Sequence, residues 1–285
     1  MSPGKNPPYI PSVRALRLAR SLKECREQAN YRVGAAAAAL GWSQPKVSHI
    51  EKGRTKPSVN DVERMLDLYG VTTPERDALL ALAAEAERRG WWTEYTDVLH
   101  GPYVALEDAS SLIMDWAPQV IPGLLQTPEY AFEVMRAGHV TDPEDLERRV
   151  RARIQRQLLL TRATDPAHLH VILDEGVLER PVGGVEVMRD QLYKLVAEAH
   201  RPTITVQVLP KTAGTHAGLE GTFIVLRFPE PAAPDVAYVE GVHGVVYIES
   251  PRAVAECNVR FEALHKQALD HDASVALIKA VAQRM

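Results

Sequence analysis

Features that mark membrane, secreted or disulfide-rich proteins are scarce in this sequence. Its 285 residues include two cysteines, Cys25 and Cys257, which lie far apart and fit no disulfide or metal framework. No apolar run approaches the roughly 20 residues that cross a bilayer, and the N-terminus lacks a signal-peptide apolar stretch. We therefore expect a cytoplasmic protein with reduced thiols and no membrane partner.

Catalytic motifs are also missing. The sequence has no nucleophile elbow, no phosphate-binding glycine loop and no His-Glu-x-x-His. His168, His170 and Asp174 share one face of an expected strand and can ligate a metal, but no further ligand cluster accompanies them, and half-buried strand histidines are commoner. Asp174 and the adjacent Glu175 face opposite ways on a strand, so they cannot share a substrate. We expect no enzyme, no metal and no cofactor.

Charge is distributed unevenly along the chain. Residues 1–60 hold 11 Lys and Arg against 3 Asp and Glu, a balance of +8, whereas residues 61–285 hold 22 against 34, a balance of −12. A basic head on an acidic body favours binding of a polyanion at the N-terminal end, although a solvated surface of uneven charge gives the same count.

The first ninety residues divide into an arm and a helical domain. Residues 1–11 contain four prolines and are expected to form a flexible N-terminal arm. Residues 12–90 show helical spacing, with apolar positions such as Ala15, Leu18 and Leu22 on one face. Five helices are expected, among them the alanine-rich 33–40 and a last one over 74–89.

The stretch "LGWSQPKVSHIEKGRTKPS", residues 40–58, predicts a helix-turn-helix. Gly41 allows the chain to leave one helix in a left-handed conformation, and Ser43 caps the next. Val47 and Ile50 point inward, and Gly53 ends the helix. A short helix with a narrow polar face fits the major groove of DNA, where side chains reach base edges and phosphates.

The outward side chains give candidate DNA contacts. The expected base readers are Gln44, Lys46, Ser48 and His49, and the expected phosphate ligands are Arg32, Ser43, Lys52, Arg54, Thr55 and Lys56. Two of these residues have plain alternatives, because Ser43 is equally well explained as a helix cap and His49 as a solvated surface histidine.

Residues 12–70 resemble the lambda- and Cro-repressor-like helix-turn-helix family, also called the xenobiotic-response-element family. The family reads Leu-Gly-x-Ser-x-x-x-Val-Ser-x-Ile-Glu-x-Gly-x-x-x-Pro-Ser, which this chain matches, and Ala37 occupies the usual small position of the preceding helix. Arg32 stands where the family has Ser or Thr, which departs from its phosphate-binding pattern. The resemblance implies a structural ion pair between Arg26 and Glu51.

Residues 91–285 are expected to form a C-terminal α+β domain, which makes the chain α+β overall. The aromatics Trp91, Trp92, Tyr95 and Tyr103 suit an interdomain seam or a dimer contact, and equally a packed helix start. Helices are expected over 104–117, 128–137, from Asp142 through a basic run, and over 184–199, 251–269 and 272–284. Alternating segments predict strands over 168–175, 203–210, 221–228, 235–240 and 244–249, the last three an antiparallel meander in an antiparallel sheet.

This second part resembles the large uncharacterised domain that follows the helix-turn-helix in an abundant group of actinobacterial regulators. The matching segments, in order, include "VIPGLLQTPEY", "LDEGVLERPVGG", "MRDQLYKL" and "YVEG", and the resemblance runs from about Leu82 to the C-terminus. The group is described as antitoxin-like transcriptional regulators, whose genes commonly lie beside one for a small protein that the regulator binds.

The sequence thus predicts a DNA-binding transcriptional regulator that acts as a homodimer on an inverted-repeat operator, since specific affinity normally needs two half-sites. Three roles remain open for the C-terminal domain. It is a regulatory module that binds a small protein partner, a small-molecule sensor whose pocket between sheet and helices is rimmed by residues 209–221, or a plain dimerisation body.

Overall fold

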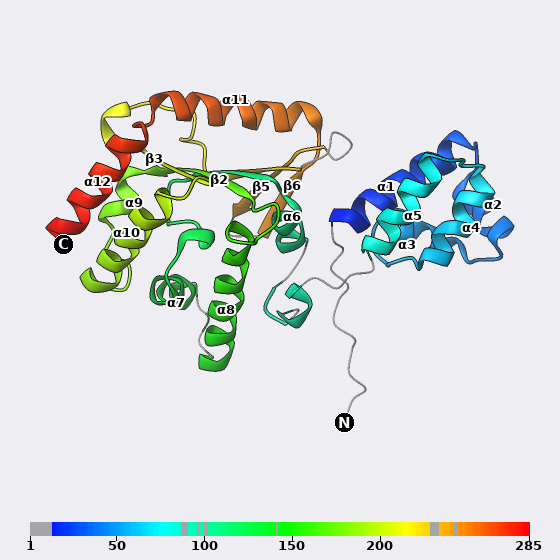
Figure 1. Cartoon of the computed structure of the whole chain (residues 1–285), viewed down its shortest axis with the longest axis horizontal. Coiled ribbons are helices and arrows are strands. Elements are labelled where there is room, and N and C mark those ends of the chain that lie inside the picture. The colour runs from blue at the N-terminus through cyan, green and yellow to red at the C-terminus, as the bar shows by residue number, and fades with distance from the viewer. Residues whose placement is uncertain are drawn as a thin grey trace. The chain divides into compact units, whose positions relative to one another are not determined.

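A computed structural model describes residues 13–86, 91–95, 97–99, 102–138, 140, 142–228, 234–241 and 244–285 (Figure 1). The predicted arm at residues 1–11 and the predicted domain junction at residue 90 lie outside the described residues. The chain forms two compact units, residues 1–109 and 110–285. None of the described helices has the length and apolar character that a membrane span requires.

The first unit contains the five predicted helices. These are α1 (Val13–Gln28), α2 (Val33–Leu40), α3 (Gln44–Glu51), α4 (Val59–Tyr69) and α5 (Glu75–Ala86). Their inward faces share one apolar core, in which Leu22, Ala36, Val47, Ile50 and Met65 are buried. Ala36 and Ala37 have small side chains, so α2 lies close against α3 and α4.

After α5 the chain forms a small aromatic cluster. The 3-10 helix η1 (Trp91–Tyr95) places Trp92 against Val104 and Ala105 of helix α6 (Tyr103–Ala109). Trp91 Nε1 donates a hydrogen bond to Asp108 Oδ1 at 3.3 Å. The sequence left open whether these aromatics form an interdomain seam or dimer contact, or pack at the start of a helix. Trp91 and Trp92 pack at the start of a helix.

The second unit is built on a six-stranded sheet of order β3-β2-β1-β4-β5-β6. Its strands are β1 (Leu112–Ala117), β2 (His168–Asp174), β3 (Ile204–Leu209), β4 (Phe223–Arg227), β5 (Val236–Gly241) and β6 (Gly244–Ile248). All five predicted strands are present within two residues of their expected ends, and the predicted meander is β4-β5-β6, with both pairs antiparallel.

Two predictions about this unit are corrected. The sheet is mixed rather than antiparallel, because β1, β2 and β3 run parallel to one another. Helical crossovers separate these three strands in the sequence, which is the connection that parallel neighbours need. The helix expected over 104–117 is instead α6 followed by strand β1. Residues 113–117 are buried in the middle of the sheet, so their sequence lacks the alternation of a half-exposed strand.

Helices cover both faces of the sheet (Figure 1). Helix α11 (Pro251–Gln267) lies along one face, where Val254, Phe261 and Leu264 pack on Trp116 and Val225. The other helices of the unit are α7 (Pro128–Ala137), α8 (Pro143–Arg156), α9 (Glu175–Glu179), α10 (Val185–Ala199) and α12 (His271–Arg284), with short 3-10 turns at 123–125, 157–160 and 211–213. The predicted α+β class is confirmed.

Candidate DNA interface

Helices α2 and α3 form the predicted helix-turn-helix. Gly41 ends α2 with a left-handed φ of 70°, which a side chain would strain. The Ser43 Oγ then accepts a hydrogen bond from the Lys46 amide at 3.4 Å, so Ser43 is the N-cap of α3. The hydroxyl hydrogen of Ser43 remains available, so the residue can cap the helix and still donate to a phosphate.

Burial divides α3 into two faces. Val47, Ile50 and Glu51 are buried, while Gln44, Pro45 and His49 are exposed and Ser48 is half-buried. Residues 44 and 48 are one helical turn apart, and so are 45 and 49, so these four side chains form one narrow strip. The structure therefore places three of the predicted base readers, Gln44, Ser48 and His49, on one outer face.

Lys46 differs from the other predicted base readers. Its Nζ lies 2.7 Å from Asp61 Oδ1 of α4 and 3.9 Å from the centre of the Trp42 ring. Burial opposes ionisation of the Asp61 carboxyl, but hydrogen bonds from Lys46 and from Ser58 outweigh it and lower the pKa of Asp61. The Lys46 ammonium thus fastens α3 to α4, and it must leave Asp61 before it reaches a base.

The helix-turn-helix motif alone does not mark Asp61 or Trp42, although the sequence carries a signal for Asp61. Ser58 and Asp61 have the spacing of a capping box, and the structure shows both of its hydrogen bonds at the start of α4. Arg64 also lies over Trp42, 5.1 Å from the ring centre, and donates to the Leu40 carbonyl at 2.6 Å.

The ion pair implied by the family resemblance is present inside the unit. Arg26 donates from Nε and Nη2 to the two carboxylate oxygens of Glu51, at 2.7 and 3.0 Å, and from Nη1 to the Tyr31 carbonyl at 2.7 Å. The side chains of Arg26 and Glu51 are 7% and 5% exposed. The hydrogen bond to Glu51 raises the pKa of Arg26. This pair ties the C-terminal end of α3 to α1.

The chain turns sharply where α3 ends. Gly53 is buried with φ of 64°, and a Cβ at this position would lie 2.7 Å from Leu16 Cδ2 of α1. Its neighbours face outward instead, since Lys52, Arg54, Thr55 and Lys56 are all exposed. Arg32, at the N-cap of α2, is exposed as well and makes no side-chain cap hydrogen bond.

The positive charge of this surface follows from its scarcity of carboxylates. Between Gln28 and Asn60 the sequence contains a single carboxylate, Glu51, and that group is buried against Arg26. The same stretch carries five cations: Arg32, Lys46, Lys52, Arg54 and Lys56. The exposed side chains of residues 29–59 are therefore neutral or positive, as a phosphate-binding surface requires.

The acidic and histidine side chains that were weighed above as a metal or acid site lie in the second unit at and after strand β2. Asp174 accepts a hydrogen bond from the Gly176 amide at 2.8 Å and caps α9, while Glu175 accepts one from the Lys211 amide at 2.7 Å. His168 is exposed at the start of β2. Within the described residues, no group of three His, Cys, Asp or Glu is arranged to hold a metal ion.

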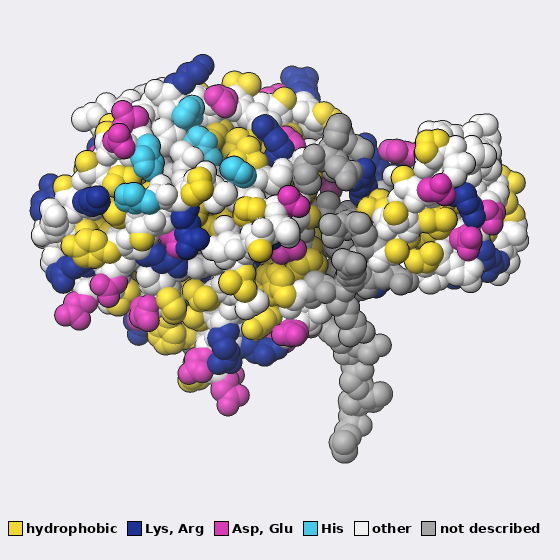
Figure 2. Space-filling model, viewed as in Figure 1, with side chains coloured by type: hydrophobic (Ala, Val, Ile, Leu, Met, Phe, Trp, Pro, Cys, Tyr) yellow, Lys and Arg dark blue, Asp and Glu magenta, His cyan; other side chains and the backbone are white. Residues whose placement is uncertain are grey.

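Histidine side chains gather on one face of the second unit, as Figure 2 shows. His170 Nε2 and His265 Nδ1 both lie within hydrogen-bond distance of Gln207 Oε1, at 2.7 and 2.6 Å. His170 also packs edge-on against Phe261. Burial lowers the pKa of His170, against the opposing effect of the Gln207 hydrogen bond. His170 and His265 therefore belong to a hydrogen-bonded packing cluster.

Comparison with known protein families agrees with this geometry. A helix-turn-helix domain family matches residues 17–79, so the first unit is a helix-turn-helix domain and the protein is a DNA-binding regulator. A second family, described as a domain of unknown function (DUF5753), matches residues 101–280. Because that match covers more than half of the chain, the protein belongs to the DUF5753 family. No curated protein and no solved structure matches the chain.

Proposed function

We propose that the protein is a sequence-specific transcriptional regulator of the lambda- and Cro-repressor-like type, which inserts α3 into the major groove. The observation that carries this proposal is the outer strip of α3, where Gln44, Ser48 and His49 stand beside cations and no exposed carboxylate lies between residues 28 and 60. The amide of Gln44 matches adenine, and the smaller polar groups match either base edges or phosphates.

The flanking residues hold the DNA backbone in this proposal. Lys52, Arg54, Thr55 and Lys56 follow directly after α3, and Arg32 begins α2. Their exposed cations and hydroxyl bind phosphates and set the register of α3, together with the free hydroxyl hydrogen of Ser43. Lys46 serves in the free protein to hold α3 against Asp61, and it reads a base only after this ion pair opens.

The regulator acts as a homodimer on an inverted repeat in the cytoplasm. A single module buries only about 600–1,000 Å² on DNA, so one copy lacks the contact area of a high-affinity complex. Two copies related by a two-fold axis bind half-sites roughly 34 Å apart, or a multiple of that distance, on one face of the duplex.

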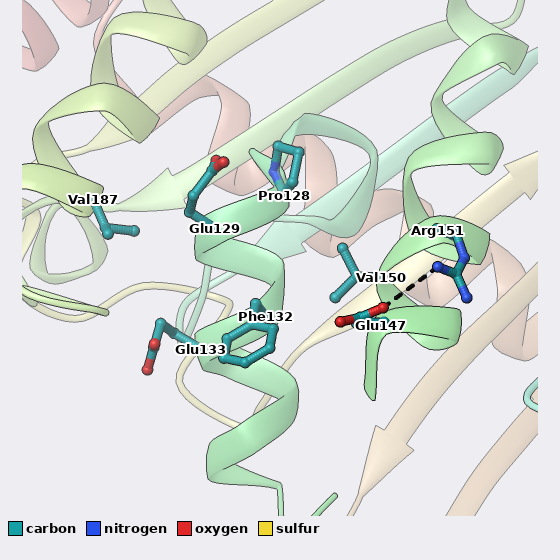
Figure 3. A pocket seen from close by; sticks show the side chains of 8 residues that line it. All are labelled: Pro128, Glu129, Phe132, Glu133, Glu147, Val150, Arg151 and Val187. Carbon is teal, nitrogen blue, oxygen red and sulfur yellow. Dashed lines mark ion pairs between the residues drawn. The ribbon is translucent and has the colours of Figure 1, made fainter. Parts of the chain in front are cut away.

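The second unit regulates this binding by receiving a small protein partner, in the manner of the actinobacterial antitoxin-like group. Residues 110–285 hold 18 Lys and Arg against 23 Asp and Glu, a net charge of −5, which suits a cationic partner. An open groove of about 490 Å³ lies beside α7 and α8 (Figure 3). Phe132 and Val150 point into it between the two helices. Glu129 and Glu133 stand around it, together with Glu147 and Arg151, which form an ion pair at 3.6 Å.

A small-molecule effector is the second candidate, and the same groove supports it, because its volume falls within the range of ligand sites. The site expected beside residues 209–221 is less suitable. Trp116 fills the space there, donating from Nε1 to the Gly218 carbonyl at 3.0 Å and meeting His216 edge-on.

One selection experiment tests both halves of the proposal. Genomic DNA fragments bound by the full-length protein are collected with and without the products of neighbouring genes. We expect an inverted repeat among the bound fragments and a change in recovery when the partner is added. Recovery of random sequence alone, under all conditions, contradicts sequence-specific binding. An unchanged recovery with every neighbouring product, but a change with a small molecule, favours the second candidate.

A further inference from the structure

The two edge strands of the six-stranded sheet, β3 and β6, differ in what lies beside them. At the β3 edge, the segment that joins α11 to α12 and the first turn of α12 supply hydrogen-bonding partners. The Leu269 amide donates to the Val208 carbonyl at 2.9 Å, and the Val208 amide donates to Ser274 Oγ at 3.0 Å. The Gln207 side chain adds a bond to the Leu269 carbonyl at 2.9 Å. This edge is closed to another strand.

The opposite edge is formed by β6. The strand pairs with β5 from Gly241–Gly244 to Ala237–Ile248, and the sheet order ends there, so no further strand of the described residues lies on its outer side. Val245 is 44% exposed and Val246 is 59% exposed. Because neighbouring strand residues face opposite sides, an apolar side chain stands in solvent on each face of the same strand.

The composition of β6 favours further pairing. Its five residues, Gly-Val-Val-Tyr-Ile, include no charge and no proline, and four of them are among the stronger β-formers. Soluble proteins usually protect an edge strand with lysine, proline or a covering segment, because unpaired N–H and C=O groups recruit another strand. The sequence of β6 contains none of these protective residues.

We propose that β6 is the dimer interface of this protein, and that its occupant is β6 of a second copy, paired antiparallel about a two-fold axis. The inference rests on the homodimer proposed above and assigns its surface. Two identical strands related by a two-fold axis run antiparallel and pair i with j and j with i, and neutral strands bring no like charges together. The two sheets then join into one sheet of twelve strands.

The short length of the strand sets the expected affinity. A stable interface buries about 1,200–2,000 Å², and five paired residues on each copy bury less than that. We therefore expect the dimer to dissociate measurably at protein concentrations of about 1–100 µM. Binding of two half-sites on one duplex then adds to the pairing, because the DNA holds both copies at a high local concentration.

Sedimentation velocity of the full-length protein, without DNA, tests this assignment. Val246→Lys places a charged side chain on the edge, and Val245→Lys does the same on the opposite face of the strand. Val259→Lys is the matched control, because Val259 is 68% exposed on α11 and undergoes the same chemical change. Circular dichroism melting establishes that each variant is folded.

We expect a concentration-dependent dimer for the natural protein and for Val259→Lys, and a dissociation constant at least about tenfold higher for both edge variants. The proposal is overturned if the natural protein stays monomeric at every concentration. It is also overturned if Val245→Lys and Val246→Lys both dimerise as strongly as Val259→Lys. Because no DNA is present in this experiment, such a result contradicts the dimer interface and not the proposed DNA binding. A protein that dimerises but binds no duplex contradicts the proposed function instead.

Discussion

Removal of the Glu51 carboxylate is the change whose effect on the first unit follows most directly from the geometry. Glu51→Leu leaves the Arg26 guanidinium buried, with the Tyr31 carbonyl at 2.7 Å and the largely exposed Glu27 carboxylate at 3.3 Å as remaining acceptors. Breaking a buried ion pair by removing one partner costs about 3–5 kcal/mol. Because two acceptors remain, we expect the lower end of that range, about 3 kcal/mol.

The double variant Arg26→Met with Glu51→Leu separates charge burial from lost packing. Removing both charges leaves no unpaired ion, and the cost then comes mainly from the Tyr31 carbonyl, which loses one hydrogen bond worth about 1 kcal/mol. The double variant is therefore expected to be more stable than Glu51→Leu alone. Glu27→Leu removes an exposed carboxylate from the same arginine and is expected to cost less than about 1 kcal/mol.

Native-state hydrogen exchange of peptides from α3 measures these free energies in the full-length chain, because it reports on the first unit separately from the second. A loss below about 1 kcal/mol for Glu51→Leu contradicts the expected cost of a stranded charge. A double variant as unstable as the sum of the two single variants contradicts the pairing of Arg26 with Glu51.

Three further predictions concern single positions. Gly53→Ala is expected to destabilise the first unit more than Gly70→Ala. Both residues have a left-handed φ near 70°, in which a Cβ costs about 1–2 kcal/mol of stability, but only at Gly53 does the new Cβ also meet Leu16. Hydrogen exchange of α1 gives the difference, and equal losses refute the close approach. Asp61→Asn should lower stability at neutral pH. The native pKa of Asp61 is depressed, so its contribution is full above about pH 4 and is lost as the pH falls through the native pKa, where the variant and the natural protein converge. Urea denaturation across pH 2–7 tests this, and a constant difference is the contrary result. Gly218→Ala places a Cβ 2.4 Å from the buried Trp116 ring and should cost the second unit about 1–3 kcal/mol, read from its melting temperature, whereas no loss shows that the ring has room.

Local chemistry explains why the limits of several helices, in both units, could be predicted. The limits of α3 follow from Ser43 at its start and from the glycine after its last turn, and the structure begins and ends the helix beside those residues. Helix α7 is equally plain, because Thr127 accepts from the Tyr130 amide and Pro128 opens the first turn. In each case the deciding contacts lie within four residues of one another.

Contacts between distant residues account for what the sequence did not predict. Strand β1 is buried between β2 and β4, so its neighbours come from residues 168–173 and 223–227, and its own pattern is ambiguous. The Lys46–Asp61 ion pair joins two helices, and no spacing rule connects their positions. The candidate DNA surface was predictable up to that point, because exposure on a short capped helix follows from its apolar residues.

The most direct test of the central claim compares Gln44→Ala with Arg54→Ala on the selected operator and on a random duplex, by fluorescence anisotropy at several salt concentrations. Gln28→Ala, an exposed glutamine at the end of α1, serves as the control.

If α3 reads bases, Gln44→Ala loses about 1–3 kcal/mol on the operator and little on the random duplex, since the lost contact is base-specific. Arg54→Ala then weakens binding to both duplexes alike and flattens the salt dependence, because a phosphate contact carries no sequence information. Losses of equal size on both duplexes for Gln44→Ala, or no loss at all, would show that α3 is not the reading helix.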